Sequence, residues 1–300
     1  MATPSKLSKP MASQILGTIN TQNYNFSADI EQLNAITKTP EEYDEFGQGY
    51  WKNLSLYNAS GEANDTQYRN TDRCIPTEYA KRCPMIQRFI SDNFRFNHLK
   101  MIRARNLVDG MVIPHRDFVE LDKSITYFRV FIALEHNKES FHSDDCGVFQ
   151  MMPGEAWFLD AGINHAAINF GNKSRMFLCL DFMFEGDFNP ADIFADKDSL
   201  LPSRKKFHID RKPLESDEAL NIITSTSALL DRHTFKDLVF TLSKFHFTYN
   251  ISVACCYDWI VSAAEMAKNP EVARKARSLR RYLIEQRAMG ERYVINDWNA

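Results

Sequence analysis

The segment at residues 112–118, VIPHRDF, decides the fold, because an apolar, strand-like run leads directly into a His-x-Asp pair. Two other segments also place a polar residue beside an apolar run: NHAA at 164–167 and RMFLCLDF at 175–182. Residues two apart on a strand point to the same face, so His115 and Asp117 can act together. The sequence therefore predicts a site at which distant strands bring their polar ends together.

These polar residues match the ligand set of a non-haem iron site. Two imidazoles and one carboxylate on one face of an iron leave positions open for a bidentate 2-keto acid and for O2. His115, Asp117 and the distant His165 would supply the three ligands. Arg175 lies ten residues beyond His165, and its planar fork could hold the far carboxylate of 2-oxoglutarate in a bidentate pair. A His-x-Asp pair alone is common by chance, so the order and spacing of all four residues carry the prediction.

The composition is that of an ordinary globular protein. The chain has 300 residues, 44% of them hydrophobic, which allows one large domain or a main domain with a smaller appendage. A net charge of −3 gives no reason to expect a nucleic-acid partner. The first ten residues are polar, and no apolar run approaches the length of a membrane span. The six cysteines form no C-x-x-C pair, so we expect reduced thiols in a cytoplasmic protein.

Strand and helix patterns divide the chain into three parts. Residues 1–13 are expected to be a flexible N-terminus. Many short strands separated by turns fill residues 14–187 and predict a double-stranded β-helix, that is, a jelly-roll or cupin-like barrel. From residue 188 to residue 300 helical patterns dominate and predict a helical C-terminal domain. The expected fold is therefore mainly β with helices.

Individual elements are predicted from periodicity and from turn residues. The expected strands include 14–19, 50–57, 127–134 and 147–151, and residues 108–110 are expected to form a turn. The expected helices are 27–36 with Ser27 as its cap, 77–94, 216–230, 234–245, 252–267 and 270–289. The polar residues 138–145 are expected to form a loop, and Pro153-Gly154 a tight turn.

The central block resembles the iron-dependent proline hydroxylases of bacteria, within the aspartyl/asparaginyl β-hydroxylase-like group of 2-oxoglutarate dioxygenases. The matching stretches are IPHRDFVELDK (113–123), FRVFIAL (128–134), PGEAWFLDAGINHAA (153–167) and RMFLCLDF (175–182). The C-terminal half resembles the helical domain of proline 3-hydroxylases, in LSKFHF (242–247), around Trp259 and in residues 280–292. The resemblance covers most of the chain.

The resemblance implies an activity and assigns the site residues. His115, Asp117 and His165 would bind Fe(II), and Arg175 would anchor 2-oxoglutarate, with O2 as the other co-substrate. The implied reaction is hydroxylation of an unactivated carbon of a free L-amino acid, most often L-proline. The alternatives are the same chemistry on L-lysine or another basic amino acid, then on a residue within a protein, and last a cupin-type binding protein without catalysis.

Other polar and aromatic residues have open roles. Arg105 and Arg129 interrupt apolar runs, so each could bind the substrate carboxylate or form a structural ion pair. Trp157 could line the cofactor pocket, although a core position is the more usual one for a tryptophan. Asp160 could orient a metal ligand or cap a turn. His142 lies in polar sequence and is expected to be exposed.

The expected partner is a small-molecule amino acid, with neither nucleic acid nor membrane. The C-terminal helices could form a homodimer interface, a lid or a docking surface, and the sequence leaves these alternatives open.

Overall fold

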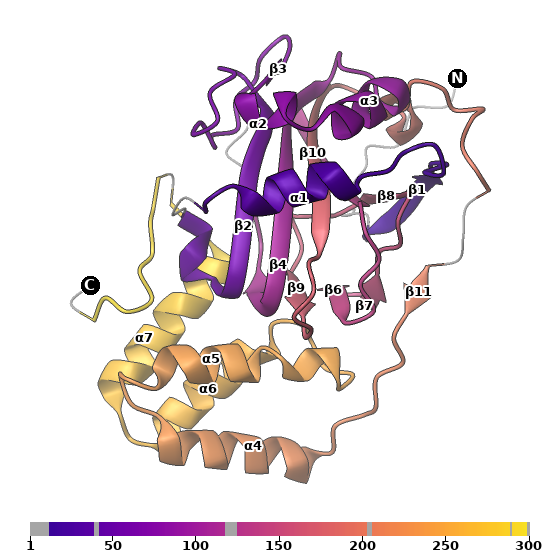
Figure 1. Cartoon of the computed structure of the whole chain (residues 1–300). Coiled ribbons are helices and arrows are strands. Elements are labelled where there is room, and N and C mark those ends of the chain that lie inside the picture. Colours follow the sequence, from indigo (N-terminus) through magenta and orange to yellow (C-terminus); the bar gives the residue numbers. More distant parts are fainter. Residues whose placement is uncertain (1–11, 39–41, 118–124, 203–205, 289, 299–300) are drawn as a thin grey trace, which may run out of the picture.

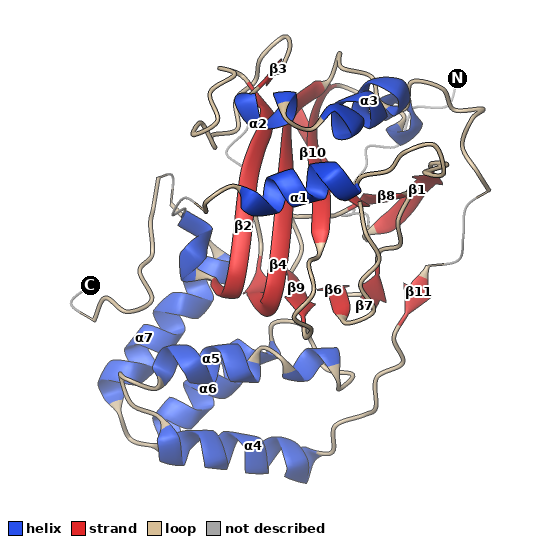
Figure 2. Ribbon diagram, in the orientation of Figure 1, coloured by secondary structure: helices blue, strands red, loops and turns tan. Residues whose placement is uncertain are grey.

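The computed structural model describes residues 12–38, 42–117, 125–202, 206–288 and 290–298. An eleven-stranded antiparallel sheet forms the body of these residues, with helices packed on one of its faces and a group of helices below it (Figures 1 and 2). The strands are β1 (Gln14–Thr18), β2 (Gly47–Asn58), β3 (Ile75–Pro76), β4 (Leu99–His115), β5 (Ile125–Ala133), β6 (Ser140–Asp144), β7 (Gly147–Gln150), β8 (Glu155–Phe158), β9 (His165–Asn169), β10 (Met176–Glu185) and β11 (Phe207–His208).

The helices lie in two groups. The α-helices are α1 (Ser27–Ala35), α2 (Glu78–Lys81), α3 (Pro84–Asn93), α4 (Ser216–Leu229), α5 (Phe235–Leu242), α6 (Cys255–Met266) and α7 (Pro270–Arg280). The short helices are η1 (Glu42–Glu45), η2 (Pro190–Ile193), η3 (Phe245–Phe247) and the π-helical turn η4 (Arg281–Glu285). Helices α1–α3 pack on the upper part of the sheet and α4–α7 lie below it (Figure 1). No helix among the described residues is both long and apolar enough to cross a membrane.

Strand β4 connects the two parts of the sheet. Along one edge it pairs with β2, whereas along the other edge its first half pairs with β10 and its last residues pair with β9. Nine of the strands follow the order β1-β8-β5-β10-β4-β9-β6-β7-β11, and β3 joins the sheet through β2. The end of β4 pairs with the start of β9, and residues of both line one cavity with Phe177 near the start of β10. The predicted double-stranded β-helix with a helical C-terminal region is confirmed.

Two glycines allow β4 to change partners in its middle. Asp109 has a φ of 43°, and Gly49 of β2 lies opposite with a φ of 76°. A Cβ atom on Gly110 would lie 1.9 Å from the carbonyl oxygen of Gln48, a separation that no side chain can adopt. The backbones of the two paired strands therefore approach each other so closely at this point that only glycine fits. The predicted turn at residues 108–110 is instead this kink within one continuous strand.

Two large hydrophobic cores lie on either side of the roll. The upper core joins β4, β5 and β10 to α1 and α3, with residues such as Leu33, Phe89 and Leu180 fully buried. The lower core joins Met111 and Ile113 of β4 to α5, α6, α7 and η4. The C-terminal helices thus share a core with the strand that carries the candidate metal ligands.

Three local predictions were wrong, each for a physical reason. The expected loop at 138–145 contains β6, because its backbone pairs with β9 and its polar side chains are buried against polar partners such as Arg175 and His246. The expected helix at 77–94 is broken into α2 and α3 at Pro84, whose ring cannot follow a helical turn without disrupting it. Ser27 does not cap α1; the residue before it, Phe26, is the N-cap, and no side chain caps this helix.

Candidate metal centre

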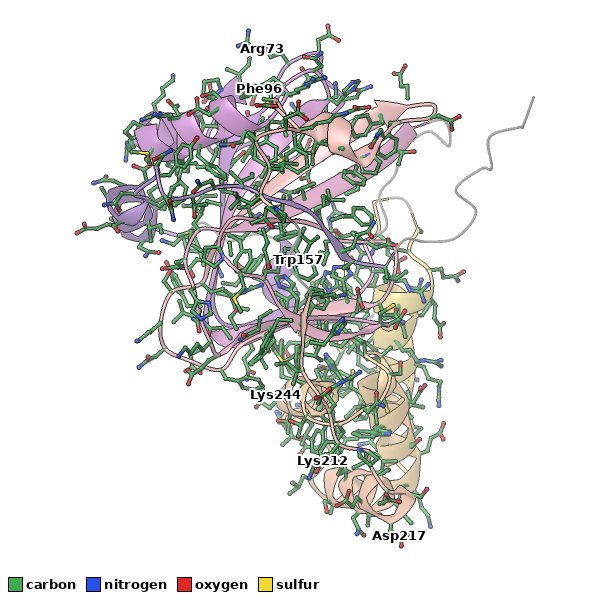
Figure 3. The ribbon with its side chains drawn as sticks, turned by 90° about the vertical axis from the view of Figure 1, so that its right-hand side faces the viewer. Arg73, Phe96, Trp157, Lys212, Asp217 and Lys244 are labelled. Atoms are coloured by element: carbon green, nitrogen blue, oxygen red, sulfur yellow. The ribbon has the colours of Figure 1, made fainter. Side chains whose placement is uncertain are left out.

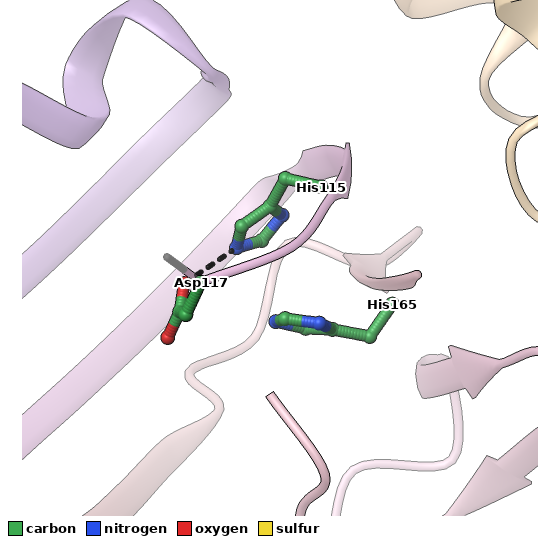
Figure 4. Close-up of side chains that lie close together, drawn as sticks. All are labelled: His115, Asp117 and His165. Atoms are coloured by element: carbon green, nitrogen blue, oxygen red, sulfur yellow. Dashed lines mark ion pairs between the residues drawn. The ribbon is translucent and has the colours of Figure 1, made fainter. Parts of the chain in front are cut away.

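The ends of β4 and β9 bring together the three predicted ligands. His115 is the last residue of β4, Asp117 follows it, and His165 is the first residue of β9. One ligand atom from each side chain lies within 4.8 Å of the others, and His115 Nε2 is 3.5 Å from Asp117 Oδ1 (Figure 4). No other group of this kind was found among the described residues. The predicted cluster is therefore assembled in space from two distant segments.

A bulge at the end of β4 turns His115 toward the site. Strict alternation would place His115 on the same face as Ile113, which packs against the C-terminal helices. Instead, Ile113 and Pro114 together lie opposite a single residue of β9, Ala166. The additional residue reverses the alternation, so that His115 lines the same cavity as Val112.

Backbone carbonyls fix the tautomers of both imidazoles. The Nδ1 of His115 lies 2.8 Å from the carbonyl oxygen of Ile113, and the Nδ1 of His165 lies 2.9 Å from that of Ile163. If each Nδ1–H donates to its carbonyl, the lone pair is on Nε2, the arrangement usual for metal-binding histidines. Asp160 does not orient His165; its Oδ1 accepts a hydrogen bond from the amide of Gly162 and so caps the turn.

The protonation states also suit a cation. Burial lowers the pKa of His115 to about 3, helped by the neighbouring His165. Burial likewise lowers the pKa of His165. Burial alone would raise the pKa of Asp117, but Arg129 and the two imidazoles hold it well below its usual value. At neutral pH the cluster therefore consists of two neutral imidazoles and one carboxylate, which is what a divalent metal requires.

Arg175 is a buried cation at the same cavity. It immediately precedes β10, is only 4% exposed, and its guanidinium stacks over the ring of Phe177 at 4.3 Å. Its Nη2 lies 2.8 Å from the Nε2 of His142, its Nε has no hydrogen-bond partner, and it forms no ion pair with a described carboxylate. Burial, and then Arg105, lower the pKa of Arg175 to about 9. A buried guanidinium in this state fits a site for an anionic ligand.

His142 was expected to be exposed, and the structure corrects this. Its side chain is buried on β6 between Arg175, Phe131 and Phe177. Burial, and then the charge of Arg175, hold the pKa of His142 well below its usual value. The neutral ring can accept a hydrogen bond from the guanidinium and so helps to orient it.

The two other predicted arginines, Arg105 and Arg129, both line the cavity but differ in their ion pairs. Arg129 forms ion pairs with Asp117 and, through Nε at 2.9 Å, with Asp181. It therefore forms the structural ion pair that was one of its two predicted roles. Arg105 pairs with no carboxylate of the described residues and lies over the rings of Trp51 and Phe131 at 5.7 and 5.5 Å.

Trp157 is fully buried among the strands (Figure 3), in one apolar cluster with Phe131 and Phe177. Its ring stacks on Phe149 with the centroids 4.7 Å apart, and its Nε1 donates to Glu155 Oε2 at 2.8 Å. It is not among the lining residues, so the core interpretation accounts for it. The described residues that line the cavity are Trp51, Arg105, Val112, His115, Asp117, Arg129, Phe131, His142, Leu159, His165, Ala166, Ala167, Arg175 and Phe177.

Asp181, which the sequence reasoning missed, links the site to the core. It is fully buried on β10 and accepts hydrogen bonds from Arg103, Arg129 and the hydroxyl of Tyr127. The pairing of β5 with β10 places Asp181 directly opposite Arg129. An aspartate inside the apolar run RMFLCLDF was the signal that could have identified it.

Two family models match most of the chain. The model described as aspartyl/asparaginyl beta-hydroxylase matches residues 21–184, and the model described as L-proline 3-hydroxylase, C-terminal, matches residues 190–291. Together they cover both the strands that carry the metal cluster and the helices below them.

Three curated relatives are similar over nearly their whole length. L-proline cis-3-hydroxylases 1 and 2 from a Streptomyces species are 39% and 38% identical, over 96% of this chain and 100% of each relative. The L-proline cis-4-hydroxylase of Rhizobium meliloti strain 1021 is 25% identical, over 94% of this chain and 99% of the relative. The chain therefore belongs to the aspartyl/asparaginyl β-hydroxylase family and is a hydroxylase whose C-terminal region is of the L-proline 3-hydroxylase type.

Proposed function

We propose that the protein is an Fe(II)- and 2-oxoglutarate-dependent dioxygenase that hydroxylates free L-proline at carbon 3. One observation carries this proposal: the cluster of His115, Asp117 and His165 shares a cavity with Arg175, a buried guanidinium without a carboxylate partner among the described residues. Such a cavity offers three ligands on one face of a metal and a separate cation for the far end of a 2-keto diacid.

The bound groups supply the oxidation, and the protein positions them. Fe(II) with 2-oxoglutarate and O2 provides the means to hydroxylate an unactivated C–H bond, while 2-oxoglutarate is converted to succinate and CO2. His115, Asp117 and His165 would hold the metal, and Arg129 orients Asp117 through their ion pair. Arg175, oriented by His142, would hold the distal carboxylate of 2-oxoglutarate. The apolar lining, which includes Leu159, Val112 and Phe177, excludes water from the reacting carbon.

Arg105 is the best candidate to bind the substrate carboxylate. It lines the cavity, its Nε is buried without a hydrogen-bond partner, and its guanidinium lies over the aromatic rings of Trp51 and Phe131. Arg129, in contrast, already pairs with Asp117 and Asp181. An amino-acid carboxylate needs one cation, and Arg105 is a cation at this cavity that has no ion-pair partner among the described residues.

The charges of the cavity favour L-proline over L-lysine. A lysine substrate carries a second ammonium group, which requires a carboxylate in a partly buried site. Asp117 is the one carboxylate among the described lining residues, and it is also a metal ligand paired with Arg129. Glu120 and Asp122, which follow Asp117 closely in the sequence, lie outside the described residues. Two of the relatives carry the name L-proline cis-3-hydroxylase, which supports carbon 3.

The proposal is tested by turnover with free amino acids. Protein reconstituted anaerobically with Fe(II) and 2-oxoglutarate is exposed to O2 with L-proline, L-lysine or another free amino acid, and succinate is measured. We expect succinate to depend on L-proline, and NMR of the product to place the hydroxyl on carbon 3. Succinate that depends on L-lysine would contradict the substrate assignment. Stable binding of Fe(II) and 2-oxoglutarate without turnover of any amino acid would point to a residue within a protein.

Replacing Arg175 by lysine should weaken 2-oxoglutarate binding by about tenfold to a hundredfold, because a point charge cannot reproduce a bidentate guanidinium–carboxylate pair. The KM for 2-oxoglutarate should rise, while the KM for L-proline should change much less. A matched Arg277→Lys variant, at an exposed ion pair with Glu265, should behave as the wild type. An unchanged KM for 2-oxoglutarate in Arg175→Lys would remove Arg175 from the binding site.

A further inference from the structure

The segment that carries the first two ligands extends beyond the regular sheet. Pairing of β4 with β2 ends at Val112, and the bulge interrupts the pairing with β9 just before His115. Pro114 has no N–H to donate. The carbonyl of Pro114 and the amide of Arg116, on either side of His115, therefore need partners from outside the sheet, because buried backbone polar groups are almost always hydrogen-bonded.

The C-terminal helices supply both partners. The hydroxyl of Tyr257, a fully buried residue on α6, donates to the carbonyl oxygen of Pro114 at 2.5 Å. The amide of Arg116 donates to the carbonyl oxygen of Leu283 at 2.9 Å. Burial raises the pKa of Tyr257 well above its usual value, so its hydroxyl keeps its proton and remains a donor.

The π-helical turn η4 explains why the Leu283 carbonyl is available. Carbonyls in the last turn of a helix find no N–H donor within that helix, so they are free to accept a hydrogen bond from another segment. The helix ends at Glu285, and Gln286 donates back to Arg281 over five residues at 2.9 Å, as in a π-turn. Leu283 is fully buried in the core shared with β4, and the upper end of α7 lies beside the lower ends of β2 and β4 (Figure 1).

We infer that the C-terminal helices position the metal ligands, with Tyr257 as a positioning residue that acts through Pro114 on His115. This inference rests on the proposed function, because it takes His115 and Asp117 as ligands. Tyr257 and the Leu283 carbonyl hold the bulged backbone on either side of His115, and the bulge is what turns that imidazole into the cavity. The metal site is therefore complete only when α6 and η4 are docked on β4.

The test compares two tyrosine variants by their Co(II) binding. Tyr257→Phe removes one hydroxyl and leaves the core packing intact. Tyr293→Phe is the matched control, because the Tyr293 hydroxyl also donates to a carbonyl of the C-terminal region, that of Lys275 at 3.3 Å. We expect Tyr257→Phe to bind Co(II) about tenfold more weakly, the lower end of what loss of an outer-shell contact costs. Its visible Co(II) absorption should also change, because the direction of His115 toward the metal changes. The control should match the wild type in both measurements.

The outcomes separate this inference from the proposed function. If the wild type binds Co(II) and Tyr257→Phe has the same affinity and spectrum, the inference is overturned while the metal site stands. If the wild type takes up no Co(II), the proposed function itself fails.

A measurement on the wild type covers the case in which Tyr257→Phe does not fold. In hydrogen exchange, the amide of Arg116 should be protected, and it should open together with the amides of η4. Rapid exchange of Arg116 while η4 stays protected would overturn the inference.

Discussion

The His165→Ala variant should fold but lose Fe(II), and L-proline-dependent succinate formation should fall to the background level measured without enzyme. The physical reason is that His115 and Asp117 alone leave a metal with two protein ligands, too few to hold a labile divalent ion in place. His165 begins β9, whose pairing with β4 and β6 is made by backbone groups that alanine retains. The variant should therefore lose the metal and the activity and should retain the fold.

This prediction is checked by metal analysis, circular dichroism and turnover on the same preparations. His98→Ala is the control, because His98 is exposed, precedes the other end of β4 from His115 and does not line the cavity. It should retain both iron and activity. Full activity of His165→Ala would exclude His165 as a ligand, and an unfolded variant would mean that the ring contact with His115, 4.3 Å between centroids, also supports the fold.

The candidate site was predictable because its chemistry is concentrated in short segments. His115, Asp117, His165 and Arg175 each adjoin an apolar run, and a site built at strand ends produces this pattern. The strands with apolar faces, such as residues 50–57 and 127–134, were predictable for the same reason and are confirmed within β2 and β5.

The strand β6 could not be predicted because the usual pattern is reversed at the site. His142, Ser143 and Asp144 are all buried, yet their side chains are polar. His142 faces the cavity and Arg175, Ser143 bonds to His246 of the C-terminal region, and Asp144 accepts from the amides of Ser13 and Cys146. Burial of apolar residues is the signal that sequence reasoning detects, and a strand that lines a polar site lacks it. The bulge at Pro114 was equally hidden, because it depends on the pairing with β9.

The sequence also showed that Arg129 needed a partner without showing which one. The partner Asp181 lies on β10, more than fifty residues away in the chain, and only the pairing of β5 with β10 places the two side by side. Arg103 joins them from β4. A network whose residues come from three strands depends on the tertiary fold, so no local sequence pattern predicts it.

That network leads to the largest expected effect on stability. Asp181→Asn should lower the free energy of unfolding by about 3–5 kcal/mol, because it leaves Arg103 and Arg129 in the core with too little negative charge. Asp181 is fully buried and accepts hydrogen bonds from both arginines and from Tyr127. Asparagine keeps the shape and one acceptor oxygen but removes the charge. Metal affinity should fall as well, since Arg129 is shared between Asp181 and Asp117.

The effect of Asp181→Asn should depend on pH in a defined direction. Burial alone would raise the pKa of Asp181, but Arg103 and Arg129 hold it well below its usual value. A carboxyl whose pKa is lower in the folded state stabilises the protein above its unfolded pKa of about 3.9, and this contribution is lost as the pH falls toward the folded pKa. The difference between wild type and variant should therefore be constant near neutrality and should shrink below about pH 4.

Urea unfolding of both proteins between pH 7 and pH 3 measures this difference directly. Asp192→Asn is the matched control, because Asp192 pairs with Lys197 at an exposed position, where solvent screens the interaction and its loss should change stability little. A variant as stable as the wild type at pH 7 would show that the two arginines are neutralised by other groups. A difference that does not shrink in acid would show that the second acceptor oxygen, and not the charge, makes Asp181 necessary.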